Sequence, residues 1–88
     1  MKINNQKMSL IVPAYQEEKG IESVLLELSE LQKKVSNIDE IIVVDDGSTD
    51  KTAEIIRSYS EFILIKHNDN HGYGSSIKTG IQNAKNAL

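Results

Sequence analysis

The fold of this chain is set by residues 41–50, which read Ile-Ile-Val-Val-Asp-Asp-Gly-Ser-Thr-Asp. Four β-branched apolar residues in a row indicate a strand buried on both faces, as in the middle of a parallel sheet. The run stops at two adjacent carboxylates, Asp45 and Asp46. In open α/β sheets the ligand crevice lies outside the carboxyl ends of the strands. The sequence therefore predicts that this acid pair lies where such folds bind their ligands.

Apolar runs of strand length alternate with helical patterns along the chain. Strands are expected at 8–12, 40–44 and 62–65, and Pro13 is expected to end the first because proline lacks the N–H that a central ladder needs. The resulting order, β-α-β-α-β-α, implies right-handed crossovers with helices packed on the sheet. The predicted fold class is therefore α/β, a Rossmann-like three-layer half-domain with a three-stranded parallel sheet.

Three helices are expected after these strands. The first covers 21–35, where apolar residues recur at spacings of three, four and seven. The second runs from a cap at Asp50 to about Tyr59. The third runs from Gly74 to the end of the chain, and the side chains expected on one of its faces are Ile77, Ile81, Ala84 and Leu88.

The composition argues against several classes of function. The 88 residues hold 10 Lys and Arg against 13 Asp and Glu, a net charge of -3, which is a poor footprint for nucleic acid or an anionic membrane. The absence of cysteine excludes disulfides and thiolate metal sites. Residues 1–7 form a polar lead-in without the apolar core of a signal peptide, and no stretch approaches the ~20 apolar residues of a membrane span. We therefore expect a cytoplasmic protein.

The end of the pattern suggests that the domain continues. The chain stops on a predicted helix, where a fourth strand would be expected. We therefore expect 8–88 to be the N-terminal part of a longer domain. The bare sheet edge that this leaves is a site where oligomers can form.

The acid pair has two interpretations. One carboxylate could accept hydrogen bonds from a ligand at the strand tip, or Asp45 and Asp46 could only end the strand and shape the turn with Gly47. Two acids at a crevice position favour the binding role. In the loop after the first strand, Tyr15 could stack on a flat base and Glu17 could bind a ligand or favour the following helix N-terminus.

The segment at the start of the third predicted helix is weaker evidence for a binding site. Gly72 and Gly74 could let a diphosphate approach backbone N–H groups, and Lys78 could face a phosphate or simply be solvated. The third glycine of a dinucleotide fingerprint is missing and no Gly-Lys-Ser/Thr follows. His67 and His71 have a spacing that would suggest a metal pair on a helix, but their neighbours predict a loop, so metal binding is not favoured.

Three segments, 9–18, 41–50 and 70–74, together resemble the start of inverting family 2 glycosyltransferases, nearest to the dolichyl- and polyprenyl-phosphate sugar transferases. The resemblance spans about residues 8–88 and implies the GT-A fold. In that fold the tyrosine loop and the acid pair hold the nucleotide, so Asp46 would bind the base with Asp45 supporting it. The nucleotide-sugar site that the resemblance implies consists of Pro13, Tyr15, Glu17, Asp45, Asp46, Gly72 and Lys78.

The resemblance also implies what the chain lacks. The family's Asp-x-Asp metal motif, catalytic base and acceptor site follow a fourth strand beyond Leu88, so a divalent cation, Mg or Mn, is expected only for the full-length enzyme. That enzyme would transfer a sugar from a UDP- or GDP-sugar to a lipid phosphate or glycan, at the cytoplasmic face of a membrane, while this chain alone would be inactive. Gln16 stands where the family usually has asparagine, which leaves the predicted site unchanged.

Other α/β domains remain as alternatives. A receiver domain also has an acid pair at a strand end, but there the pair follows the first strand rather than the second. A non-catalytic regulatory or interaction module with the same fold is a second alternative. A nucleotidyltransferase would carry a glycine-rich basic loop after its first strand, whereas residues 13–20 are acidic.

Overall fold

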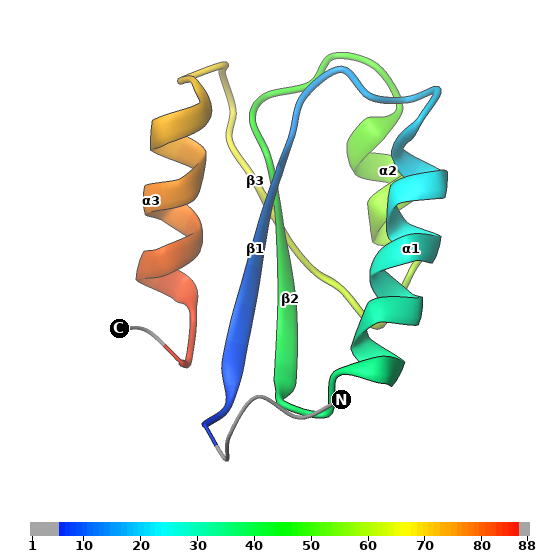
Figure 1. Cartoon of the computed structure of the whole chain (residues 1–88). Helices are drawn as coiled ribbons and strands as arrows, with labels where there is room; N and C mark the ends of the chain where they lie inside the picture. Colours follow the sequence, from blue (N-terminus) through cyan, green and yellow to red (C-terminus); the bar gives the residue numbers. More distant parts are fainter. Residues whose placement is uncertain (1–5, 87–88) are drawn as a thin grey trace.

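The computed structural model of the chain describes residues 6–86 and has the predicted α/β architecture. Its parallel sheet has the order β1 (Met8–Ala14), β2 (Ile38–Asp45), β3 (Ile63–Lys66), so that β2 is the central strand. Figure 1 shows α1 (Ile21–Lys34) and α2 (Thr52–Arg57) on one side of the sheet and α3 (Tyr73–Asn83) on the other. The predicted element order and parallel sheet are confirmed.

The core is built around β2, whose apolar run has no exposed surface. Because successive side chains of a strand point to opposite faces, Ile41 and Val43 face α1 and α2, where they join the core cluster with Leu25 and Ile56. Ile42 and Val44 are equally buried and belong to the other face. Burial on both faces explains why this segment is a continuous apolar run instead of an alternating pattern.

Pro13 lies inside β1 and does not end it as predicted. The Ala14 carbonyl accepts the Asp46 N–H (2.8 Å), so Ala14 points its polar backbone groups toward β2 and Pro13 points its nitrogen toward the open edge. The missing N–H of proline therefore removes no bond from the ladder. The other strand predictions were short or shifted: β2 extends the predicted 40–44 at both ends, and β3 lies one residue later than 62–65.

The helix predictions need three corrections. α2 has Lys51 as its N-cap, while the Asp50 carboxylate accepts the Thr52 N–H (2.9 Å), and the helix ends at Arg57, before Tyr59. On α1, the predicted apolar face is only partly covered, with Val24 and Leu31 about two-fifths exposed. α3 ends at Asn83, so the predicted helix to the chain end is wrong, and Leu88 lies outside the described residues.

The face that α3 turns to the sheet is lined by small residues. Ser76 and Gly80 are buried, whereas Ile81 is 48% exposed. A Cβ placed on Gly80 would lie 2.3 Å from Cγ2 of Ile11 in β1. Small residues therefore let the helix backbone approach the strand closely, and the more apolar positions of α3 are displaced toward solvent.

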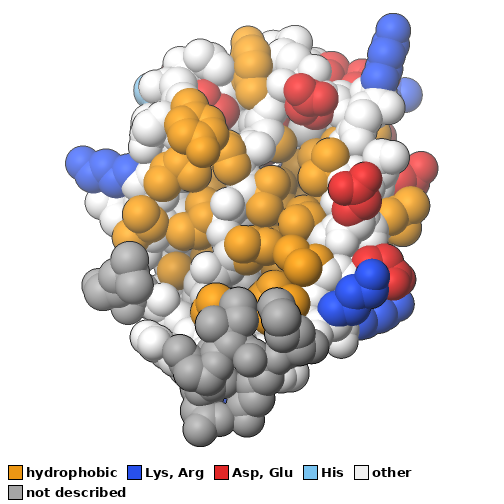
Figure 2. All heavy atoms as spheres, viewed as in Figure 1, with side chains coloured by type: hydrophobic (Ala, Val, Ile, Leu, Met, Phe, Trp, Pro, Cys, Tyr) orange, Lys and Arg blue, Asp and Glu red, His pale blue; other side chains and the backbone are white. Residues whose placement is uncertain are grey.

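The β1 edge is open in the described part of the chain, where β1 pairs only with β2. Most of its residues are only half-buried. Figure 2 shows hydrophobic side chains gathered over this face of the molecule, between α3 and α1. The predicted oligomerisation through a bare edge stays a prediction, but the unpaired edge on which it depends is present.

Leu25→Ala should lower the free energy of unfolding by about 2–5 kcal/mol, because Leu25 has no exposed surface and truncation leaves a cavity under α1. The matched control is its neighbour Leu26→Ala, since Leu26 is 55% exposed and should change stability by no more than about 0.5 kcal/mol. Urea unfolding followed by circular dichroism measures both. Equal effects of the two substitutions would contradict the assigned inner face of α1.

Gly80→Ala should destabilise the chain by about 1–3 kcal/mol, because the new methyl group would overlap the stiff β-branched side chain of Ile11. Gly74→Ala is the control on the same helix, since a Cβ there meets nothing within 4 Å. That substitution should stabilise by up to about 1 kcal/mol through helix propensity. Thermal unfolding of both variants measures the difference, and a gain at Gly80 would show that α3 does not pack this closely.

Candidate functional site

The pleat of β2 separates the two adjacent carboxylates of the acid pair. Asp45 continues the face of Ile41 and Val43, where it accepts bonds from the Ser48 hydroxyl and N–H and lies 3.4 Å from Nζ of Lys66. Asp46 lies one residue further and belongs to the face that α3 covers. Asp45 is therefore tied into the turn and β3, while Asp46 faces the loop that leads into α3.

The Asp46 carboxylate is surrounded by donors from the β3–α3 loop. Nδ1 of His67 lies 2.7 Å from Oδ1, and the Asn70 side-chain amide donates to Oδ2 at 3.1 Å. The backbone N–H of His71 (3.0 Å) and that of Gly72 (2.7 Å) complete the set. On the far side of the ring, Nε2 of His67 lies 2.8 Å from the Thr79 hydroxyl, which links the carboxylate to α3.

These contacts change the acidity of Asp46. Burial alone would raise its pKa, but the His67 side chain and the N–H groups of His71 and Gly72 together hold the pKa below its usual value. Asp46 is only 4% exposed and carries its charge because the loop solvates it. A carboxylate can accept about four hydrogen bonds, so these four donor groups use nearly all of the acceptor capacity of Asp46.

The loop after β1 is clamped to the turn after β2 by a series of hydrogen bonds. Gln16 has a φ of 50°, and its side-chain carbonyl accepts the Thr49 N–H (2.6 Å) while its own N–H donates to the Ser48 hydroxyl (2.8 Å). The Glu17 N–H donates to the Thr52 hydroxyl at 2.9 Å. These bonds fix the backbone that directly follows Tyr15 and give the polar residues of 48–52 a structural role.

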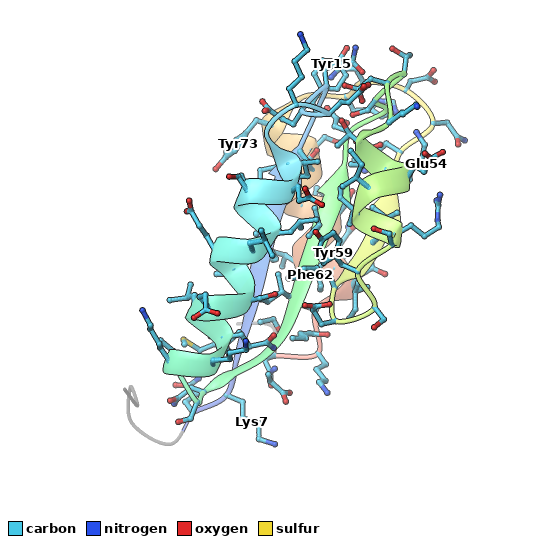
Figure 3. The ribbon with its side chains drawn as sticks, turned by 90° about the vertical axis from the view of Figure 1, so that its right-hand side faces the viewer. Lys7, Tyr15, Glu54, Tyr59, Phe62 and Tyr73 are labelled. Carbon is cyan, nitrogen blue, oxygen red and sulfur yellow. The ribbon has the colours of Figure 1, made fainter. Side chains whose placement is uncertain are left out.

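A cleft of about 320 Å³ opens at the carboxyl ends of β1 and β2, beside the start of α3. Its volume falls in the range of small-molecule sites. Figure 3 shows two of its residues, Tyr15 and Tyr73, at the same end of the molecule, opposite Lys7. The residues that line the cleft are Pro13, Ala14, Tyr15, Glu17, Asp46, Asn70, Gly72, Tyr73 and Ser76.

Five of the seven residues predicted for the site meet in this cleft. The two others do not line it: Asp45 is buried beside Lys66, and Lys78 is exposed on α3. Sequence reasoning did not assign a role to Asn70, Tyr73 or Ser76. Asn70 and Tyr73 fall in the quoted glycine-containing segment, whereas only the small-residue face of α3 could have pointed to Ser76.

The described residues do not supply a divalent-cation site. No group of three or more His, Asp or Glu side chains among them is arranged to hold a metal. His67 and His71 lie in the β3–α3 loop with their rings edge to face at 5.4 Å, and His67 is engaged by Asp46. Both acids of the pair are already bound by N–H, hydroxyl or ammonium groups, so they do not fit a cation.

Comparisons with a family model and with known proteins agree on one family. The model of "Glycosyl transferase family 2" matches residues 9–88. The chain is 40% identical to a dolichyl-phosphate beta-glucosyltransferase of Dictyostelium discoideum, over 90% of this chain and 28% of that protein. It is 37% identical to a UDP-N-acetylglucosamine--dolichyl-phosphate N-acetylglucosaminyltransferase of Methanococcus voltae, over 85% of this chain and 34% of that protein.

Solved structures agree with this fold. The crystal structure of S. aureus TarS 1-349 superposes with a TM-score of 0.74 at 30% identity, covering 91% of this chain and 25% of that one. Mannosyl-3-phosphoglycerate synthase from Rubrobacter xylanophilus superposes with a TM-score of 0.77 at 23% identity, covering 91% and 28%, which supports the fold alone. This chain thus spans about a third or less of the length of these relatives. Among residues 6–86, no helix is both long and apolar enough to cross a membrane.

Asp46→Asn should lower the free energy of unfolding at pH 7 by about 1–3 kcal/mol, because an amide would turn its own N–H groups toward the loop donors. The pKa of Asp46 is lowered in the folded chain, so its contribution is present above the ordinary carboxyl pKa and is lost as the pH falls through the lowered pKa. The difference from wild type should therefore shrink between about pH 5 and pH 2.

Urea unfolding across this pH range measures the effect. The control is Asp69→Asn, since Asp69 is exposed in the same loop and its side chain makes no bond within residues 6–86. A constant difference at all pH values would show that the Asp46 charge does not hold the loop.

Proposed function

Because this chain belongs to glycosyl transferase family 2, we propose that it forms the nucleotide-binding part of an enzyme that transfers a sugar from a nucleotide sugar to a lipid phosphate or glycan. The observation that carries this proposal is the cleft at the carboxyl ends of β1 and β2. Its position matches the place where open parallel sheets bind ligands, and its walls combine flat side chains with a few polar groups.

The cleft suits the base and ribose better than the diphosphate. Tyr15 is 46% exposed at its rim and offers a ring on which a base can stack. The Glu17 carboxylate makes no hydrogen bond within the described residues, so it is available to a hydroxyl or N–H of the ligand. No Lys or Arg is among the described residues that line the cleft, which leaves no cationic partner for phosphate.

We infer a UDP- or GDP-sugar as donor, and the name of the Methanococcus voltae relative includes a UDP-sugar. The acceptor is proposed as a lipid phosphate or glycan, since both relatives named above carry dolichyl phosphate in their names. A lipid-phosphate acceptor would place the whole enzyme at a membrane, and we propose the cytoplasmic face as its location.

The chain by itself is proposed to bind and not to catalyse. A transfer reaction needs a carboxylate free to activate the acceptor hydroxyl. Asp45 and Asp46 are both engaged, and Glu17 is the one cleft carboxylate without a bond in the described part of the chain. A divalent cation used by the whole enzyme would be held by residues other than this acid pair.

An amide NMR titration of the 88-residue chain with UDP and with GDP tests the proposal. We expect shifts at Tyr15, Gly72 and Tyr73 that occur without Mg²⁺, because the described residues provide no site for the ion. A dispersed spectrum in which neither nucleotide moves these signals would refute a nucleoside cleft in this chain.

Tyr15→Ala should weaken the binding of the preferred nucleotide by about 5-fold or more, because stacking of a base on an aromatic ring is worth about 1–3 kcal/mol. The control is Glu18→Gln, since the Glu18 carboxylate accepts the Lys51 N–H (3.1 Å) and does not line the cleft. Fluorescence or calorimetric titration gives both dissociation constants. Equal losses in the two variants would mean that the ligand does not lie against Tyr15.

A further inference from the structure

The four donors on the Asp46 carboxylate differ in how firmly the fold holds them. Two are the backbone N–H groups of His71 and Gly72, which cannot leave unless the loop changes its course. The third comes from the ring of His67, which is engaged at both of its nitrogens. The fourth is the side-chain amide of Asn70, an exposed residue, and it donates at 3.1 Å, against 2.7 Å for the N–H of Gly72. The amide of Asn70 is therefore the donor that the fold holds least.

Rotation of the Asn70 side chain would leave the loop backbone in place. The backbone is held against Gly47, where a Cβ would lie 2.7 Å from the backbone nitrogen of Asn70. Within the described residues, the side-chain amide donates only to Asp46, to Oδ2 at 3.1 Å and to the main-chain oxygen at 3.4 Å. Because Asn70 is exposed, water can replace these bonds when the side chain turns away. The amide can therefore leave Asp46 at little cost to the fold.

The contact between Asn70 and Asp46 lies at the wall of the cleft, because both residues line it. Asp46 is only 4% exposed, whereas Asn70 is exposed, so the amide is the outer of the two groups. A ligand N–H in place of the amide would meet Oδ2 while the three other donors still solvate the buried charge. The negative charge of the carboxylate attracts such an N–H group and repels phosphate oxygens. The position therefore suits a hydrogen-bond donor of the ligand.

We propose that the side-chain amide of Asn70 is a placeholder, which in the free chain occupies the Asp46 oxygen that a ring N–H of the nucleotide base takes over on binding. This inference rests on the proposed function, because it takes the ligand of the cleft to be a nucleotide whose base is bound by Asp46. It adds a residue that competes with the ligand and so lowers the affinity of the cleft. Removal of the Asn70 amide should therefore tighten binding, although Asn70 lines the cleft.

Calorimetric titration of the 88-residue chain with UDP and with GDP tests the placeholder. Asn70→Ala should bind the preferred nucleotide about 5-fold more tightly than wild type, because the ligand no longer displaces a hydrogen bond. The matched control is Asn68→Ala, which should leave the affinity unchanged, since Asn68 is exposed in the same loop and does not line the cleft. Equal or weaker binding by Asn70→Ala would overturn the inference and leave the proposed function intact.

An analogue of the same nucleotide, methylated at the ring N–H, separates the exchange of a hydrogen bond from a gain of space. The analogue cannot donate to Asp46, so it has no need to displace the Asn70 amide. We therefore expect Asn70→Ala to bind the analogue no more tightly than wild type does. A gain as large as the one for the parent nucleotide would mean that the smaller side chain only makes room, and would overturn the inference.

The side-chain NH₂ signals of Asn70 give a readout that needs no variant. In the free chain this amide is bonded to a carboxylate, and saturating nucleotide should move its NMR signals toward those of the exposed Asn68 amide. Signals of the Asn70 amide that stay in place while the backbone signals of Tyr15 and Gly72 move would overturn the inference. A wild-type chain that binds neither nucleotide would refute the proposed function, and the inference with it.

Discussion

The solvation of the Asp46 carboxylate by the β3–α3 loop is the constraint on which the rest of the site depends. A buried charge is tolerated only when hydrogen bonds replace its lost water, and here two side chains and two backbone N–H groups do so. The same bonds fix the loop to the end of β2 and so place the N-terminus of α3. The start of α3, which forms one wall of the cleft, is therefore held in place by the acid that follows β2.

Close approach of backbone segments is the second requirement of this geometry. Gly47 has a φ of 78°, and a Cβ there would lie 2.4 Å from the carbonyl carbon of Asp69, so the turn after β2 and the β3–α3 loop can touch only at a glycine. Gly72 has a φ of 96°, which lets the chain turn its N–H toward Asp46 as α3 begins. Gly80 then allows α3 to lie against β1. The geometry of the cleft therefore depends on these glycines, which have no side chain, as much as on the side chains that line it.

The fold could be predicted from the sequence because its strongest signals are local. The apolar run of β2 and the helical spacing of 21–35 identify their elements without knowledge of the partners. The side chain that pairs with Asp46 could not be found in this way, since it depends on the register of β3, which lies one residue later than predicted. The buried face of α3 could not be found from hydrophobicity, because that criterion selects Ile77 and Ile81, whereas the sheet accepts the smaller Ser76 and Gly80.

The acid pair shows why a site residue and its role need separate arguments. The sequence correctly indicates that two carboxylates stand at the carboxyl edge of the sheet, but the pleat sends Asp45 to Lys66 and Asp46 to the loop, and each is satisfied there. The carboxylate of Glu17 also lines the cleft, and it makes no hydrogen bond within the described residues. Under the proposed function, the phosphates of the nucleotide would point away from Asp45 and Asp46, because no Lys or Arg among the described residues that line the cleft offsets the repulsion between like charges.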